Sequence, residues 1–256
     1  MHCCCVDYFI YSNAEKREVM SSVAYFVSPH GFGHAARASA VMLALRVRQP
    51  ELKMEIFTQV PEWFFADTLQ SGYGYHNVLT DIGMAQRTPL EEDVPETLRR
   101  LQAFIPFSGP RLDEMAAELK ALDCRLVVSD ISPLGIAAAQ RAGLPSVLVE
   151  NFTWDWIYEG YLTDAPELVA SMEYLQHIFA QADYHIQAEP VCKPSAEADL
   201  VASPISRPRR TSAPVLRQQL GAPQDQRMVL ITLGGIEGYI AVSAQLKKAK
   251  DLFFVV

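Results

Sequence analysis

The sequence lacks a long apolar run, an excess of basic side chains and a recognisable leader. No stretch approaches the ~20 consecutive apolar residues that a membrane-spanning helix needs. Lys and Arg number 22 against 30 Asp and Glu, which gives a formal net charge of -8, whereas nucleic acids and anionic membranes attract basic patches. The first ten residues show no cationic region followed by an apolar one. We therefore expect a cytoplasmic protein with no nucleic-acid partner and no integral membrane segment.

Cysteine is scarce and is not arranged in pairs. The five cysteines form one contiguous run and two isolated positions: Cys3, Cys4, Cys5, Cys124 and Cys192. Adjacent cysteines do not have the spacing of metal ligands, and no second half-site accompanies them. We therefore expect no metal site and a reducing compartment. A lipidated or metal-binding amino terminus stays open as an alternative.

What the sequence does contain is a Gly-rich turn between an apolar run and an amphipathic helix. Residues 23–28 form the run, and two glycines and two histidines fill the turn: His30, Gly31, Gly33 and His34. In a parallel α/β sheet such turns lie at the carboxyl ends of the strands, where ligands bind. Free N–H groups at a helix N-terminus also attract an anion. The turn therefore predicts a binding site, and histidine adds a group that can accept a proton near neutral pH.

The glycine spacing of this turn excludes one class of site and fits another only loosely. No Gly-Lys-Ser/Thr sequence is present in it, so the turn is not a phosphate loop. Gly31-x-Gly33-x-x-Ala36 meets the loose form of the dinucleotide fingerprint. However, the next predicted strand, 53–58, ends without the acidic residue that binds the ribose. A Rossmann-type oxidoreductase is therefore a weak alternative.

Apolar runs alternate with helical segments along the next part of the chain. The clearest unit is a buried strand at 125–129, an exit turn at Asp130, a helix over 134–142 and a second strand at 146–149. An earlier strand is predicted at 75–81. Continuous apolar strands joined by helices indicate a parallel sheet that is covered on both faces. The fold class is therefore α/β, with a Rossmann-type parallel sheet.

An aromatic segment leaves the strand at 146–149 and should border the same edge of the sheet. Asn151 and Asp155 carry polar groups that can bond sugar hydroxyls, and Trp154 offers a ring that can stack on a sugar. Aromatic side chains are more often part of the core. We place Asn151 and Asp155 at the cleft, and we expect Trp156 and Tyr158 in the core.

The composition divides the chain into four segments. A ragged N-terminal extension over 1–20 precedes an α/β domain over 21–202, and a linker with several prolines and arginines covers 203–214. Residues 215–256 begin a second Rossmann-type domain. Because this domain ends inside an apolar strand, it cannot close its own core. We therefore expect a truncated chain, shorter than the complete protein by about a hundred residues or more.

Two motifs, in this order, carry a family resemblance that covers roughly 23–256. They are HGFGHAAR after the first strand and VVSDISPLGIAAAQRAGLPSVLVENFTWDWIYEGY further on. Together they closely resemble the N-terminal, glycosyltransferase-like region of L-arabinokinases. Two α/β domains joined by a linker are also similar to the GT-B glycosyltransferase architecture. The kinase half of an arabinokinase, with its own phosphate loop, is absent, so arabinose phosphorylation is not implied.

The resemblance implies transfer of a sugar from a nucleotide-sugar donor to an unknown acceptor, with no further cofactor. A histidine at the start of the first helix often serves as the base in inverting enzymes of this type, and an aspartate after a later strand orients it. His34 and Asp130 match these two positions. The physical logic is that of hydrolase triads, in which a carboxylate fixes the tautomer of the imidazole and stabilises the imidazolium. A backbone-bonding histidine and a helix-capping aspartate are the simpler alternatives.

The remaining candidate residues belong to substrate binding. His30 competes with His34 but is better suited to shaping the loop or touching substrate. Arg37 can pair with Asp130, meet a phosphate or be structural. The expected substrate-binding set is His30, Gly31, Gly33, Arg37, Asn151, Trp154 and Asp155. The expected donor-binding set is the second Gly-rich turn, Gly234, Gly235 and Gly238.

Two readings other than an active glycosyltransferase stay open. One is a non-catalytic module that binds a sugar or a nucleotide-sugar. The other is an inactive, truncated fragment. The usual donor motif lies beyond Val256 in the family pattern, and this departure bears on catalytic competence. Turnover separates the first alternative from an enzyme, because a module binds the donor without releasing nucleoside diphosphate.

Overall fold

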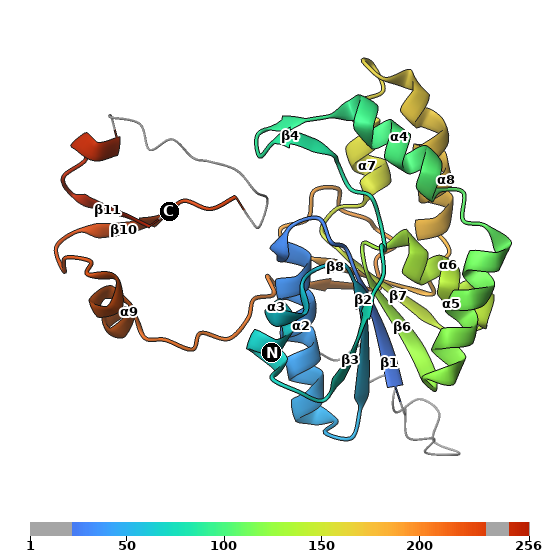
Figure 1. Ribbon diagram of the computed structural model, residues 1–256, viewed down its shortest axis with the longest axis horizontal. Helices are drawn as coiled ribbons and strands as arrows, with labels where there is room; N and C mark the ends of the chain where they lie inside the picture. The colour runs from blue at the N-terminus through green and yellow to red at the C-terminus, as the bar shows by residue number, and fades with distance from the viewer. Residues whose placement is uncertain (1–21, 234–245, 256) are drawn as a thin grey trace.

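The computed structural model describes residues 22–233 and 246–255, and its centre is a seven-stranded sheet in the order β3-β2-β1-β6-β7-β8-β9 (Figure 1). Every pairing within this sheet is parallel. The strands are β1 (Ser22–Val27), β2 (Lys53–Thr58), β3 (Tyr73–Asn77), β6 (Cys124–Asp130), β7 (Ser146–Glu150), β8 (Tyr184–Ala188) and β9 (Leu200–Ala202). The order reverses between β1 and β6, as in a doubly wound Rossmann sheet. The α/β fold class is therefore confirmed.

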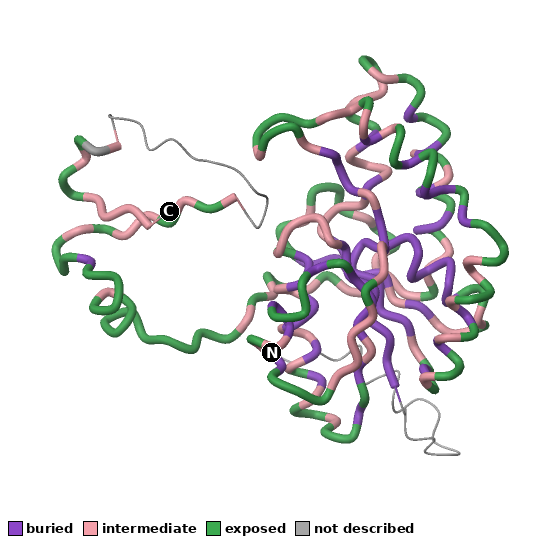
Figure 2. Tube along the Cα trace, viewed as in Figure 1, coloured by how far each residue is buried: buried purple, intermediate pink, exposed green. Residues whose placement is uncertain are grey.

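Helices cover both faces of the sheet, and the alternation of side chains along β1 shows why. Val23, Tyr25 and Val27 pack with α2 and α3 on one face, whereas Ala24 and Phe26 pack with the helices of the other. All five side chains are at most 1% exposed. The helices are α2 (Phe32–Arg48), α3 (Glu62–Leu69), α4 (Val94–Phe104), α5 (Gly109–Ala121), α6 (Pro133–Ala142), α7 (Trp154–Glu159), η1 (Pro166–Leu168) and α8 (Val169–Phe179). The sheet is thus buried between two apolar layers (Figure 2).

The strand predicted at 75–81 is shorter than expected and begins earlier, at Tyr73. Beyond Asn77 the chain leaves the edge of the sheet and crosses the end of β1. Thr80 marks this crossing, because its hydroxyl donates a 2.9 Å hydrogen bond to the carbonyl of Val27. The apolar pattern predicted a longer strand because residues 78–82 are buried or half-buried even though they are not in the ladder.

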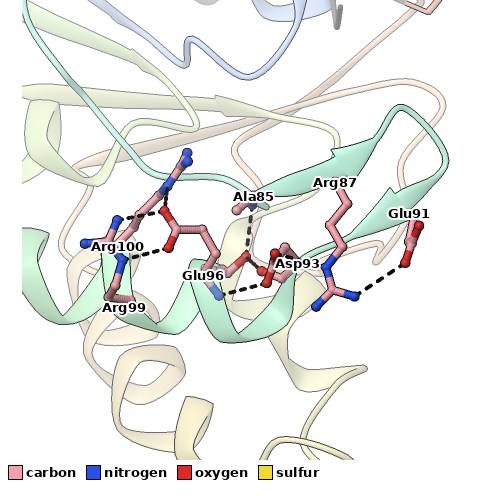
Figure 3. Close-up of polar contacts among 8 residues, drawn as sticks. Ala85, Arg87, Glu91, Asp93, Glu96, Arg99 and Arg100 are labelled. Carbon is pink, nitrogen blue, oxygen red and sulfur yellow. Dashed lines mark hydrogen bonds and ion pairs between the residues drawn. The ribbon is translucent and has the colours of Figure 1, made fainter. Parts of the chain in front are cut away.

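After this crossing loop, a short hairpin of β4 (Gln86–Thr88) and β5 (Glu91–Glu92) leads into α4. Asp93 is the N-cap of α4 and accepts a 3.0 Å hydrogen bond from the amide of Glu96 (Figure 3). Arg87 donates to Asp93 at 3.1 Å, so the hairpin and the helix start share one carboxylate (Figure 3). The amide of Ala85 donates to Thr97 at 2.9 Å. These bonds hold the loop that precedes the hairpin against α4.

The C-terminal segment lies apart from the seven-stranded sheet in Figure 1. It comprises α9 (Ala213–Leu220), β10 (Arg227–Leu230), η2 (Leu246–Lys248) and β11 (Leu252–Val255), with β10 and β11 paired in parallel. None of the residues of α9 is buried, in contrast to the helices of the sheet (Figure 2). The division into domains stays a prediction. No helix in the described part of the chain is long and apolar enough to cross a membrane.

Candidate functional site

The candidate site lies where the strand order reverses, at the carboxyl ends of β1 and β6. Val27 pairs with Asp130 at the ends of these two strands. Gly31 follows β1 and precedes α2 with φ 76° and ψ 177°, a backbone conformation that is essentially restricted to glycine. Gly33 has open space around it instead. The turn therefore requires glycine at position 31 for its backbone conformation. Helix α2 then begins at the switch point, the place where the strand order reverses between β1 and β6.

His34 and Asp130, which the sequence placed at one sheet edge, are in direct contact. The Nδ1 atom of His34 lies 2.8 Å from Oδ1 of Asp130. His34 is 7% exposed and Asp130 is 2% exposed. Since an ionised carboxylate can only accept, the contact assigns the proton to Nδ1 and leaves Nε2 as an acceptor. Nε2 has no hydrogen-bond partner among the residues that the structure describes.

Arg37 completes the contacts of Asp130 from one turn further along α2. Its Nε donates to Oδ2 of Asp130 at 2.8 Å, and its Nη2 donates to Oδ1 at 2.6 Å. Nη1 donates to Oδ1 of Asn151 at 2.8 Å. Burial raises the pKa of Asp130, but Arg37 and His34 outweigh this effect and the net pKa is lowered. Of the three roles left open for Arg37, the structure shows the pairing with Asp130.

His30 occupies the same turn but has a different environment. Its imidazole lies edge-on to Trp154 with ring centroids 4.9 Å apart, and it rests against the backbone of Gly83. The contact is so close that a Cβ at position 83 would lie 2.7 Å from Nδ1 of His30. Burial, together with the nearby His34, lowers the pKa of His30 to about 4. His30 is therefore a neutral imidazole at physiological pH.

The aromatic segment after β7 differs from expectation in which ring is buried. Trp154 is 2% exposed and packs between Phe152 and Tyr158, with ring centroids 5.4 Å and 6.2 Å away. Tyr158 is fully buried, as expected, whereas Trp156 is only half-buried. The prediction of a sugar-facing Trp154 and a core Trp156 is therefore wrong. Trp154 begins α7 and turns inward, so its ring has no free face on which a sugar could stack.

Of the polar residues of this segment, Asn151 contacts the site through Arg37, and the placement of Asp155 at the site stays a prediction. Asn151 is half-buried, and its carbonyl oxygen is occupied by Arg37, so its amide N–H₂ is the group left to meet a ligand. Asp155 lies in the first turn of α7, and burial raises the pKa of its carboxyl. Neither Asn151 nor Asp155 makes a hydrogen bond to His34 in the described part of the chain.

Two buried carboxyl groups near the site were missed by the sequence analysis. Glu150 ends β7, is 3% exposed, and accepts from His185 at 2.8 Å and Gln187 at 2.6 Å. It also raises the pKa of Arg37. Asp81 lies in the loop after β3 and is 1% exposed. The rule that polar strand ends meet at one edge would have found both residues, because Glu150 ends β7 and Asp81 ends the strand predicted at 75–81.

The expected donor-binding glycines, Gly234, Gly235 and Gly238, lie outside the described residues. Within 22–233 and 246–255, no group of three or more His, Cys, Asp or Glu residues is arranged to hold a metal ion. The described site therefore consists of protein side chains at the ends of β1, β6 and β7, together with the loop after β3.

These observations define a doubly wound Rossmann-type domain with a His–Asp–Arg cluster at its switch point. The chain is similar to L-arabinokinase of Arabidopsis thaliana, with 30% identity over 219 residues. The aligned region is 83% of this chain but 21% of that protein, so the chain spans about a fifth of the length of this curated relative. No protein-family model matches the chain.

Glycosyltransferases are among the solved structures that are similar to the chain. MurG of Acinetobacter baumannii is 14% identical, with a TM-score of 0.43 over 82% of this chain and 52% of that one. SnogD from Streptomyces nogalater is 16% identical, with a TM-score of 0.49 over 91% of this chain and 64% of that one. The 30% identity to L-arabinokinase confirms the resemblance to that protein that the two sequence motifs carry.

Proposed function

We propose that this chain is the acceptor-side part of a glycosyltransferase that uses a nucleotide-sugar donor. The observation that carries the proposal is the buried His34–Asp130 contact of 2.8 Å at the switch point of the sheet. A histidine held in this way has one nitrogen fixed by a carboxylate and the other free to accept a proton. The similarity to L-arabinokinase supports handling of a sugar, without assigning that protein's activity to this chain.

In the proposed reaction His34 acts as the general base. Its Nε2 takes the proton of the acceptor hydroxyl while the hydroxyl oxygen forms a bond to the anomeric carbon of the donor sugar. The bond from that carbon to the nucleoside diphosphate breaks, and the diphosphate leaves with the bonding electron pair. Asp130 holds the Nδ1–H tautomer and stabilises the imidazolium that forms. The reaction needs no electron donor or acceptor.

The electrostatics favour His34 over His30 as the base. His34 has a carboxylate partner, which stabilises its protonated form. No carboxylate contacts the ring of His30 in the described part of the chain, and burial lowers its pKa to about 4. A group with so low a pKa is a weak proton acceptor at neutral pH. We therefore assign His30 to the shape of the turn and to contact with substrate.

One observation favours the alternative of a non-catalytic binding module. Arg37 neutralises much of the charge of Asp130, and its Nη2 also lies 3.3 Å from Nδ1 of His34. A guanidinium so close to the ring disfavours a second positive charge beside it. The same residues can then serve as a rigid wall for binding. Turnover decides between the two functions.

The test uses the protein expressed from its complete reading frame, with a panel of nucleotide-sugars and simple hydroxyl acceptors. Release of nucleoside diphosphate that depends on the acceptor is the expected result. Binding of a nucleotide-sugar, measured by calorimetry, without release under any condition would support the module instead. Neither binding nor release across the panel would contradict both functions.

A further inference from the structure

The loop after β3 places an acidic side chain, Asp81, next to the turn between β1 and α2. It is fixed at two points, because Thr80 bonds the carbonyl of Val27 at 2.9 Å and Tyr158 bonds the carbonyl of Gly83 at 2.7 Å. Asp81 lies between these two anchors. The loop therefore cannot carry Asp81 into solvent without breaking bonds to β1 and to α7.

The carboxyl group of Asp81 is buried. The residue is 1% exposed, and neither carboxyl oxygen makes a hydrogen bond of normal geometry to any described residue. Trp154, whose indole Nε1 also makes no hydrogen bond to a described residue, and Ser28 lie beside the carboxyl. An isolated buried carboxylate is costly, and such a group becomes neutral instead. The geometry thus favours a carboxylic acid at this position.

The charged and titratable groups that face Asp81 also favour its neutral carboxylic acid form. Burial raises the pKa of Asp81 to about 7, and the negative charge of Asp130 on β6 also raises it. Ser28 and Trp154 act in the opposite direction and lower this pKa. On α7, burial and the nearby Asp81 raise the pKa of Tyr158 well above its ordinary value, so the phenol is neutral. Asp130 is the neighbour that is ionised, and it is the residue that contacts His34.

We propose that Asp81 is a third ionisable member of the His34–Asp130 site. As the neutral acid it leaves His34 free to stay unprotonated, and as the anion it adds negative charge next to Asp130 and so raises the proton affinity of His34. Asp81 is then a neutral acid while Asp130 is ionised, because the two carboxyl groups lie in different environments, as in sites that pair an acid with a base. Asp81 is a positioning residue, and only its consequence for catalysis rests on the proposed function.

The first test compares the unfolding of the wild-type protein and Asp81→Asn in urea between pH 5 and pH 8. Because the pKa of Asp81 is higher in the folded state than in the unfolded chain, folded protein loses stability as pH rises through this range. The carboxamide of the variant cannot ionise and does not show this loss. We expect the folding equilibrium constant of the wild type to fall about 100-fold relative to the variant. Asp113→Asn, which changes an exposed carboxylate paired with Arg141 at 2.6 Å, is the matched control and should show no such trend.

A difference between wild type and Asp81→Asn that is constant across this pH range would overturn the proposal, since it would mean that Asp81 does not change charge. If the variant does not fold, the carboxyl ¹³C resonance of Asp81 in the wild-type protein answers the same question. A midpoint above pH 6 supports the proposal, and one near pH 4 refutes it.

The second test measures the coupling to His34 by NMR titration of its imidazole. Asp81→Asn removes one charge from a partly buried network, so we expect the titration curve of the imidazole to differ between the variant and the wild type. An unchanged titration of His34 would refute the coupling. Both tests are made without a sugar substrate, so their outcome is independent of whether the protein transfers one.

Discussion

Asp130 is the single residue that affects both the stability of the fold and the geometry of the candidate site. It is 2% exposed and holds two cationic or potentially cationic partners, Arg37 and His34, through both of its oxygens. Its net pKa is lowered, so it contributes stability above the pKa of an unfolded aspartate, and that stability is lost as pH falls below it. The same carboxylate thus stabilises the fold and orients the proposed base.

Asp130→Asn removes this charge with little change in shape. It leaves the guanidinium of Arg37, whose side chain is 11% exposed, without its main counter-ion. Breaking a buried ion pair on one side is strongly destabilising, and we expect a loss of about 3 kcal/mol in the free energy of unfolding at pH 7. Urea titration measures it. Asp113→Asn, on the surface, should leave the midpoint unchanged; equal effects of the two variants would contradict the assigned burial.

At the residue level the sequence predicted which side chains meet, but not how they share charge. The family resemblance implied the pairing of His34 with Asp130, and the adjacency of β1 and β6 in the parallel sheet brings the two residues together. The inward turn of Trp154 could not be predicted, because Trp154 and Trp156 are equally apolar and only packing against Phe152 and Tyr158 distinguishes them.

Among the elements, the turn between β1 and α2 places the histidines, and its two glycines have different roles. Gly31→Ala forces a side chain into a backbone conformation with φ 76°, at a cost of about 1–3 kcal/mol. Gly33→Ala meets no atom within 4 Å. Since Gly33 lies in α2, alanine there should be neutral or stabilising by up to about 1 kcal/mol. Urea unfolding of the two variants gives the comparison, and equal destabilisation would refute the distinction.

The elements also show where sequence patterns are sufficient. The unit β6–α6–β7 was predicted almost to the residue, because continuous apolar strands and a helix that ends at Gly143 leave no other arrangement. The loop after β3 was misassigned as strand because burial in a loop produces the same apolar pattern as burial in a sheet. Its course depends on tertiary bonds, such as Thr80 to Val27, that no local pattern encodes.

For the whole molecule, the linker between the sheet and the C-terminal segment is anchored to α3. Arg207 and Arg210 both bond the carboxylate of Asp67, at 3.2 Å and 2.5 Å. The guanidinium of Arg207 also lies over the ring of Phe64, 4.6 Å from its centroid. The sequence predicts these arginines only as part of a polar linker. In the structure, Arg207 and Arg210 hold the linker against α3.

Limited proteolysis with trypsin tests this anchor. Asp67→Ala releases Arg210, and we expect cleavage after that residue to become several-fold faster at a protease concentration that leaves the wild-type linker largely intact. Asp113→Ala removes a comparable exposed ion-pair partner elsewhere and should leave linker cleavage unchanged. Identical cleavage rates for wild type and Asp67→Ala would show that the contacts do not hold the linker in solution.

The central claim is that His34, oriented by Asp130, removes the proton of an acceptor hydroxyl. Its most direct test is the rate of acceptor-dependent nucleoside diphosphate release by His34→Ala, measured beside His177→Ala, in which an exposed histidine on α8 is changed in the same way. General base catalysis predicts a loss of about 10²–10⁴-fold for His34→Ala, with little change for His177→Ala. A His34→Ala protein that folds and releases nucleoside diphosphate at the wild-type rate would contradict the account.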